Sequence, residues 1–115
     1  MIVSPDVKVF LAVGVTDLRK SINGLSALVE EEMSLNPFKG ALFGFCNRKR
    51  DLIKLLYWDR NGFALWMKRL EKDHFPWPNT QDSRLDITGR ELRWLLDGLT
   101  LESHAFERLK FESAG

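Results

Sequence analysis

The side chains with the clearest capacity for chemistry in this chain are clustered cations. They form four groups along the sequence: Arg19-Lys20, Arg48-Lys49-Arg50, Lys54 and Lys68-Arg69. Aromatic residues such as Phe43, Phe45 and Trp58 lie between these groups. Cations attract phosphates and aromatic rings stack on unpaired bases, so the combination suits nucleic acid. The same residues also fit a hydrophobic sheet face with lysine and arginine stems along its rim, and both interpretations stay open.

Residues that could support catalysis are present but do not form a recognisable set. His74 and His104 lack histidine or cysteine neighbours at the spacing of metal ligands. Cys46, the single cysteine, falls within an apolar run and is expected to be a small core residue. The aspartates are scattered over turns and helix caps, and no glycine-rich phosphate loop occurs. We therefore expect a non-enzymatic protein with no cofactor and no metal site.

The composition describes an ordinary globular chain. It has 115 residues and a formal net charge of +1, so any basic patch must be local. The length fits one domain, which we place at residues 1–102, followed by a tail or short helix at 103–115. We expect no membrane partner, because no apolar run could span a bilayer. Together with the lack of a secretory signal at the start, this favours a cytoplasmic location.

Apolar and β-branched runs predict five strands. The runs are 7–13, 41–47, 52–59, 63–70 and a short edge strand at 84–87. A first helix is expected after a cap at Thr16 or Asp17, ending at Asn36-Pro37. A second helix should begin at Thr88, because Thr88 and Glu91 fit a capping box, and Gly98 is a plausible stop. The fold class is therefore α+β: a mainly antiparallel β-meander with two helices packed on it. The sequence does not place the first strand in the sheet.

The charges of the first helix are unusual. Arg19 and Lys20 fall in its predicted first turn and the glutamates at 30–32 in its last, so both ends oppose the helix dipole. Cations at a helix N-terminus would make a concentrated anion site, suited to phosphate. The alternative, that solvent and nearby acids screen these charges, carries equal weight.

The hairpin sets which cations share a face. A two-residue turn at Asn61-Gly62 would place Lys54 directly opposite Arg69. A four-residue loop at 48–51 would place Phe45 beside Lys54. Like charges opposite each other are destabilising, so this pair suggests a bound anion or a nearby acid.

The segment Phe75-Pro76-Trp77-Pro78 should be an extended strap, because alternate prolines fix φ and remove donors. Phe75 and Trp77 are candidate partner-binding residues, since aromatic residues often anchor interfaces. A packed loop is the other interpretation of the strap.

Several of these motifs resemble a known family of mobile-element proteins. The resemblance rests on the opening 9–20, on Asn23-Gly24-Leu25, on the central signature from Leu42 to Pro78 and on Leu85 with the Thr88 helix. The resemblance covers about residues 7 to 100. Over this range the chain is similar to the second open reading frame product, TnpB type, of bacterial insertion sequence sixty-six elements. Ala64, Met67 and Asp73-His74 depart from the common residues of that family.

The resemblance implies an accessory protein of transposition that accompanies a separate transposase. It supplies no active site to carry over. The basic residues of the signature become the best candidates for contact with DNA: Arg19, Lys20, Arg48, Lys49, Arg50, Lys54, Lys68 and Arg69. The leading hypothesis is DNA binding, with the element ends as partner. The alternative is a protein–protein adaptor that binds the transposase, and the sequence does not give an oligomeric state.

Overall fold

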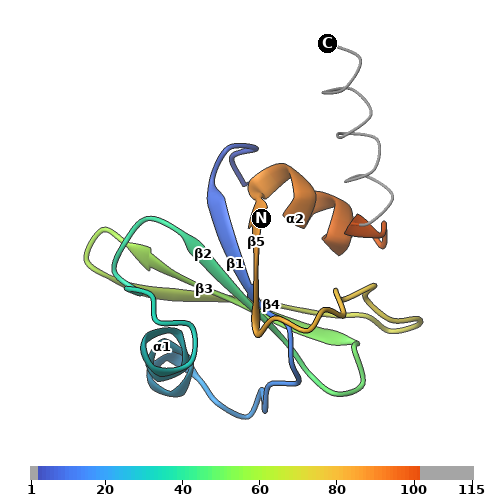
Figure 1. Cartoon of the computed structure of the whole chain (residues 1–115), viewed down its shortest axis with the longest axis horizontal. Helices are drawn as coiled ribbons and strands as arrows, with labels where there is room; N and C mark the ends of the chain where they lie inside the picture. The colour runs from blue at the N-terminus through green and yellow to red at the C-terminus, as the bar shows by residue number, and fades with distance from the viewer. Residues whose placement is uncertain (1–2, 102–115) are drawn as a thin grey trace.

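Five strands form one mixed sheet with a helix on each face (Figure 1). The computed structural model describes residues 3–101, so the predicted tail at 103–115 lies outside the described residues. The elements are β1 (Lys8–Ala12), α1 (Ile22–Glu31), β2 (Leu42–Cys46), β3 (Leu52–Asp59), β4 (Gly62–Arg69), β5 (Arg84–Thr88) and α2 (Gly89–Leu96). The strand order is β4-β3-β2-β1-β5. The α+β prediction is confirmed.

The first strand, which the sequence could not place, lies between β2 and β5. It pairs in parallel with β2 and antiparallel with β5, and the remaining neighbours are antiparallel. The parallel pair makes β1–α1–β2 a crossover unit, because parallel neighbours cannot be joined by a tight turn. The sheet is therefore mixed, not a simple meander.

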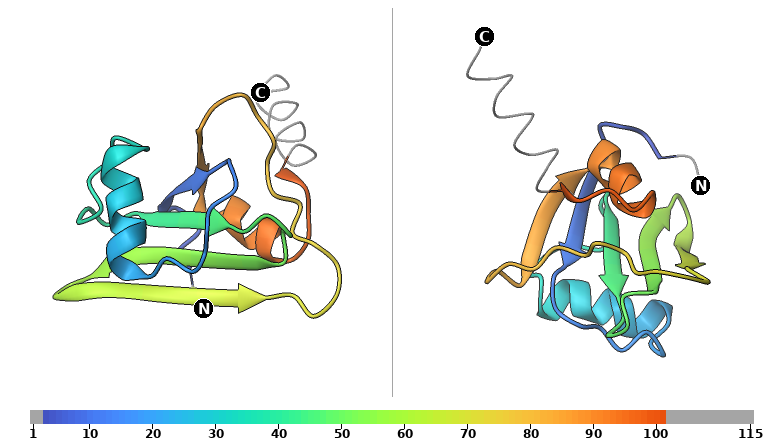
Figure 2. Two further views of the ribbon diagram at one scale, coloured as in Figure 1. Left: turned by 90° about the horizontal axis from the view of Figure 1, so that it is seen from below. Right: turned by 90° about the vertical axis from the view of Figure 1, so that its right-hand side faces the viewer.

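Two hydrophobic cores lie on opposite faces of this sheet. The first includes Leu25 and Val29 of α1, packed with Phe43 and Phe45. The second includes Leu92 of α2 and the aromatic residues of the strap at 75–78. The right-hand view of Figure 2 shows α1 and α2 on either side of the strands. Side chains alternate between faces along a strand, which explains how β2 supplies Phe43 to one core and Leu42 to the other.

The strap is part of the second core. Phe75 and Trp77 are 2% and 8% exposed, and Trp77 Nε1 donates a hydrogen bond of 2.9 Å to the Ala12 carbonyl. Gly44 in the central strand β2 leaves room for this packing, since a Cβ there would lie 2.6 Å from Leu11 and 3.6 Å from Trp77. The burial of Phe75 and Trp77 agrees with the packed-loop interpretation of the strap, and the exposed surface that the anchor interpretation expected is not present at these two rings.

The turn between β3 and β4 is displaced by one residue from its predicted position. Asp59 pairs with Gly62, so the turn residues are Arg60 and Asn61, and Arg60 takes a positive φ of 55°. The displacement brings Trp58 opposite Phe63, with their rings edge to face at 5.0 Å. An aromatic contact of this kind contributes about 0.5–1.5 kcal/mol, enough to compete with the local preference of Asn-Gly.

The predicted Lys54–Arg69 pair is wrong for the same reason. Lys54 lies opposite Met67, and Arg69 lies opposite Leu52. The register shift is two residues, so both cations still share the α1 face but are diagonal neighbours. The predicted pairing of Phe45 with Lys54 is confirmed.

Helix α1 begins later than predicted, at Ile22, with Ser21 as its N-cap. Asp17 instead accepts a bond from the Arg19 backbone N–H at 3.0 Å, which forms a local turn. The carbonyl of Leu18 is bound by the Lys54 ammonium, so it does not serve a helical turn. Arg19 and Lys20 therefore precede the helix, and the prediction that they lie in its first turn is wrong.

Helix α2 follows its sequence signals. The Thr88 hydroxyl accepts from the Glu91 N–H at 3.2 Å, and the Glu91 carboxylate accepts from the Thr88 N–H at 3.1 Å. Gly98 adopts a φ of 88° just beyond the helix, as a left-handed stop requires. The predicted capping box and the predicted stop are both confirmed. Among the described residues, neither helix has the length and apolar character needed to cross a bilayer.

Candidate nucleic-acid interface

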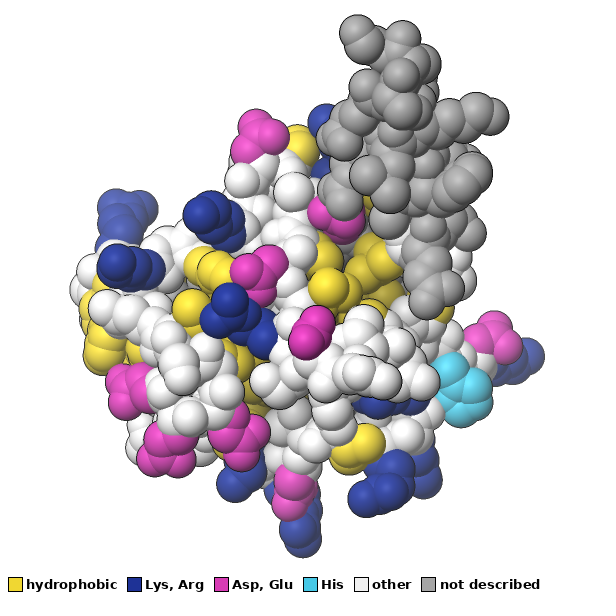
Figure 3. All heavy atoms as spheres, in the orientation of Figure 1, with side chains coloured by type: hydrophobic (Ala, Val, Ile, Leu, Met, Phe, Trp, Pro, Cys, Tyr) yellow, Lys and Arg dark blue, Asp and Glu magenta, His cyan; other side chains and the backbone are white. Residues whose placement is uncertain are grey.

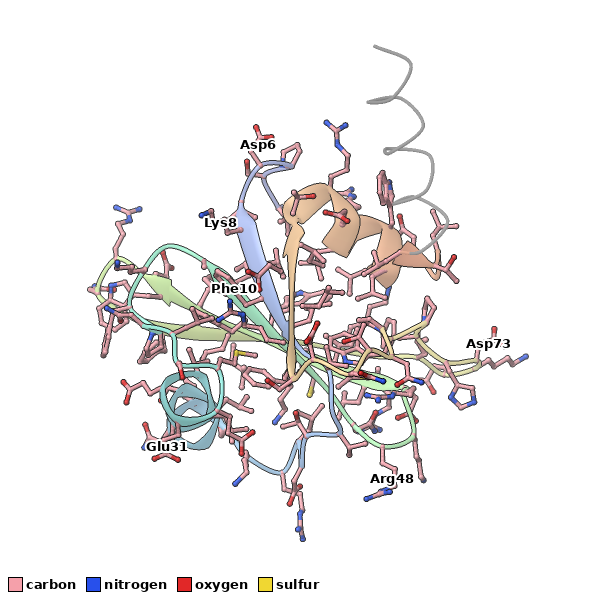
Figure 4. The ribbon with its side chains drawn as sticks, in the orientation of Figure 1. Asp6, Lys8, Phe10, Glu31, Arg48 and Asp73 are labelled. Carbon is pink, nitrogen blue, oxygen red and sulfur yellow. The ribbon has the colours of Figure 1, made fainter. Side chains whose placement is uncertain are left out.

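Four of the predicted cations surround one depression at an end of the sheet, which we call the basic groove. The residues lining it are Val15, Thr16, Asp17, Leu18, Arg19, Asn47, Arg48, Lys49, Asp51, Leu52 and Arg69, around a volume of about 860 Å³. They come from the loop after β1, the β2–β3 turn and the end of β4. Four cations face two carboxylates, so the groove has an excess of positive charge. Figure 3 shows basic side chains along the lower rim of the molecule, and Figure 4 places Arg48 there.

The β2–β3 turn, residues 47–51, is shaped by one asparagine. The Asn47 side-chain oxygen accepts from the backbone N–H groups of Asp51 and Leu52, both at 3.1 Å. Its amide nitrogen donates to the Asp51 carboxylate at 2.7 Å. Arg50 takes a positive φ of 59° to close the turn. Such a conformation costs an arginine about 1 kcal/mol or more, which the surrounding bonds must offset.

The segment at 74–75 holds the turn from the other side. His74 Nδ1 donates to the Lys49 carbonyl at 2.7 Å, and the Phe75 N–H donates to the Arg50 carbonyl at 2.7 Å. The backbone of the turn is thus fixed while the side chains of Arg48 and Lys49 remain exposed. A fixed backbone with free cationic tips suits contact with phosphates, because little backbone entropy is lost on binding.

The loop after β1 contributes Arg19. Its guanidinium binds the Asp17 carboxylate at 2.7 Å, and the Arg19 side chain is 91% exposed. This contact lowers the pKa of Asp17 to about 2. The loop is attached to the sheet, because the Thr16 N–H donates to the Cys46 carbonyl at 3.0 Å.

Asp51 is the second carboxylate of the groove. The Asn47 hydrogen bond is the main reason that its pKa is lowered, and the charges of Lys49 and Arg69 act in the same direction. The two cations are therefore close enough to Asp51 to stabilise its charge. Neither forms a salt bridge within the described part of the chain, and neither does Arg48. Their charge remains available to a ligand.

Lys54 is a structural residue. Its ammonium donates to the Leu18 carbonyl at 2.7 Å and to the Lys20 carbonyl at 3.0 Å. These bonds attach the loop before α1 to the middle of the sheet and support the segment that carries Arg19. The anion or acid expected beside Lys54 is replaced by two backbone carbonyls.

Lys68 and Arg50 also turn toward the protein. Lys68 donates to the Leu96 carbonyl at 3.4 Å, where α2 ends, and a cation is favourable at a helix C-terminus. Arg50 directs its guanidinium inward, and its buried Nη1 has no hydrogen-bond partner among the described residues. Burial raises the pKa of the neighbouring Cys46 thiol, and Arg50 opposes this shift. Neither cation lines the basic groove.

The structure thus divides the predicted set. Arg19, Arg48, Lys49 and Arg69 meet at the groove, Lys20 is exposed beside it, and the remaining three make internal contacts. Sequence reasoning missed the polar residues of the groove, Asn47, Asp17 and Asp51. Their signal was an asparagine and an aspartate flanking three cations between two strands, which is typical of a side-chain-bonded turn. Among the described residues, no three side chains of metal-ligating type gather at one point.

Comparison with known proteins identifies the family of this chain. The structure is that of a small α+β protein with a groove lined by four basic and two acidic side chains. Residues 7–105 match the family model described as IS66 Orf2 like protein, and the chain belongs to this family of insertion-sequence accessory proteins.

Two curated relatives come from Sinorhizobium fredii. The uncharacterized protein y4hO is 36% identical over 94 residues, which is 82% of each chain. The uncharacterized protein y4jC is 32% identical over 96 residues, covering 84% of this chain and 82% of the relative. No solved structure matches the chain.

Proposed function

We propose that this protein is a transposition accessory factor that binds the DNA of its element through the basic groove. The observation that carries the proposal is the meeting of Arg19, Arg48, Lys49 and Arg69 from three separate segments at one open depression. Three of these cations have no salt bridge within the described residues. Cations of this kind bind DNA by displacing the counterions of phosphates.

The positions of the cations around the groove favour contact with the phosphate backbone of DNA over recognition of its bases. Its cations are exposed on a loop, on a turn and at a strand end, not on a helix that could enter the major groove. Contacts to phosphate position a protein on DNA without specifying sequence. We therefore propose that the groove supplies affinity and leaves the choice of site to another component of the element, such as its transposase.

The test is binding to duplex DNA from the ends of the element across a salt series. Contact of Arg48, Lys49 and Arg69 with three phosphates gives a log–log slope of about −2.7. Reversing two charges in the variant Arg48→Glu/Lys49→Glu should flatten the slope to about −0.9 and weaken binding about fiftyfold at 0.1 M salt.

The matched control is Lys39→Glu/Arg60→Glu. It makes the same change in net charge, but both residues are exposed outside the groove, and Arg60 lies at the opposite end of the β3–β4 hairpin. Equal losses in the two double variants would show attraction by net charge alone and would contradict a groove. Absence of binding by the unaltered protein at low salt would also contradict the proposal.

The adaptor role remains the second proposal, with the transposase as partner. Its suggested anchor is weakened, because Phe75 and Trp77 are buried in the second core. A pull-down with the transposase, with and without end DNA, separates the two roles. A protein that binds the transposase directly is pulled down with it in the absence of DNA. Two proteins that are connected only through DNA are pulled down together only when end DNA is present.

A further inference from the structure

The outer edge of β4 presents unpaired backbone groups. β4 is the last strand in the sheet order, so β3 is its one neighbour among the described strands (Figure 2). The Leu70 N–H donates to the Asp51 carbonyl at 2.8 Å, which fixes the alternation of the antiparallel ladder. Even-numbered residues of β4 therefore bond to β3, and the backbone groups of Phe63, Leu65, Met67 and Arg69 point away from the sheet.

The described residues outside β3 make no backbone hydrogen bond to this edge. No backbone hydrogen bond outside the β3–β4 ladder involves a described residue of Gly62–Arg69. The strand is eight residues long, contains no proline, and has charges only at positions 68 and 69. Natural proteins usually protect free edges with short strands, charges, prolines or bulges. The length and composition of β4 are those of a strand that pairs with another strand.

The opposite edge of the same sheet shows the usual protection. β5 has five residues, and Arg84 binds Asp86 at 2.8 Å along its exposed surface. Helix α2 begins directly after it. Both β4 and β5 are terminal strands of the described sheet, and β4 differs from β5 in being longer and in having an uncharged run at residues 62–67.

The side chains above the β4 edge are apolar. Phe63, Leu65 and Met67 share the face that also carries α1, and Met67 is 55% exposed. A second strand at this edge would place its own alternate side chains beside them. An identical β4 offers the same apolar row, so the surface is complementary to itself.

Charge selects the orientation of such a pair. The basic end of β4 carries Lys68 and Arg69, whereas at the hairpin end Asp59 is followed by Arg60, so that end has no net charge. Parallel pairing would bring the basic ends of two copies together. Antiparallel pairing separates them and brings each basic end toward the hairpin end of the other copy, where the charges of Asp59 and Arg60 balance. It is also the arrangement that a twofold axis generates.

We propose that two copies of this chain associate through antiparallel pairing of their β4 strands, forming one continuous sheet across a symmetric dimer. The proposal is independent of DNA binding, because it uses the backbone and the apolar row of β4. It leaves Arg48 and Lys49 of both copies exposed.

The test is the molar mass in solution without DNA, measured by sedimentation over a concentration series. The unaltered protein should approach twice the mass of the 13.3 kDa chain. Met67→Pro removes an outward N–H that the monomer does not use, and proline is tolerated where an edge N–H faces solvent. It should raise the dissociation constant about thirtyfold, since the lost bond occurs twice in a symmetric pair.

Met67→Lys is the second variant, because an edge lysine opposes strand pairing without constraining the backbone. Leu99→Lys is the matched control, since Leu99 is 45% exposed and lies outside the sheet. The control should keep the dimer mass. A monomeric unaltered protein would overturn the proposal, and so would a dimer that persists unchanged in both Met67 variants.

Amide hydrogen exchange gives an independent test at the level of single residues. The N–H groups of Leu65 and Met67 should be protected at high protein concentration and lose protection on dilution. The N–H of Trp66, which faces β3, should stay protected throughout. If the amide exchange rates of Leu65 and Met67 do not depend on protein concentration, strand pairing is contradicted.

Discussion

The basic groove and the framework beneath it use similar residues for opposite purposes. Arg48, Lys49 and Arg69 extend toward solvent at the groove, while Lys54 and Lys68 are bonded to backbone carbonyls. An exposed cation that makes no internal bond can be replaced with little effect on the fold, but a bonded one cannot. The comparison teaches that the position of a basic residue in this fold, more than its presence in a cluster, decides whether it can serve binding.

The largest expected effect lies in the framework, at Trp77. Trp77→Ala should lower the free energy of unfolding by about 3–5 kcal/mol, because it empties the space over Gly44 and leaves the Ala12 carbonyl without its partner. Urea unfolding measures the change. Trp77→Phe, which keeps a ring and loses the N–H, should cost less. A stable Trp77→Ala protein that fails to bind its partner would place the strap in the binding region instead.

Lys54 should give the next largest effect. Lys54→Met removes two charged hydrogen bonds to the carbonyls of Leu18 and Lys20, at a cost of about 1.5–3 kcal/mol. Arg69→Met on the same face should change stability by less than about 0.5 kcal/mol and weaken DNA binding. Thermal melts and binding isotherms of the two variants compare them directly. If Lys54→Met were neutral for stability and harmful to binding, the division between groove and framework would be wrong.

Lys68 should give a smaller effect. Its bond to the Leu96 carbonyl is long, at 3.4 Å, so Lys68→Met should cost about 0.5–1 kcal/mol through the loss of a cation at the end of α2. DNA binding should be unchanged, because Lys68 does not line the groove. Measurements in 1 M salt should reduce the difference in stability, since screening weakens the helix-dipole interaction. A salt-independent loss would point to packing of the lysine stem.

The smallest effect concerns protonation within the groove. The Asp17 carboxyl, whose pKa is lowered to about 2 from 3.8 by Arg19, should titrate near that value in an NMR experiment. Because the folded pKa is lowered, its contribution to stability is present above pH 3.8 and lost as the pH falls through about 2. Arg19→Ala should raise the midpoint toward 3.8. An unchanged midpoint would mean that Arg19 points elsewhere in solution.

Much of the architecture could be predicted because local signals agreed with the fold. The capping box at Thr88 and Glu91 and the loop that aligns Phe45 with Lys54 depend on neighbours in sequence, and both were predicted. The β3–β4 register was not, because the contact between Trp58 and Phe63 outweighs the turn preference of Asn61-Gly62. The start of α1 was missed because a distant residue, Lys54, binds the Leu18 carbonyl.

The candidate site was predictable only in part. The sequence is enough to select the basic residues as candidates. It does not give the direction of each side chain, because that direction depends on tertiary contacts. Lys49 and Arg50 are adjacent, yet one is exposed and the other is directed toward Cys46, because the positive φ of Arg50 reverses the chain at that point. No periodicity in the sequence distinguishes them.

The most direct test of the account is a map of backbone amide NMR shifts on addition of duplex DNA. We expect the changes to gather at residues 15–19, at the turn 47–51 and near Arg69, which together line the basic groove. Residues of α2 and the β3–β4 turn at Arg60-Asn61 should be unaffected. Shifts that centre on α2 or on the Arg60 turn, with the groove unchanged, would contradict the assignment of DNA binding to the groove.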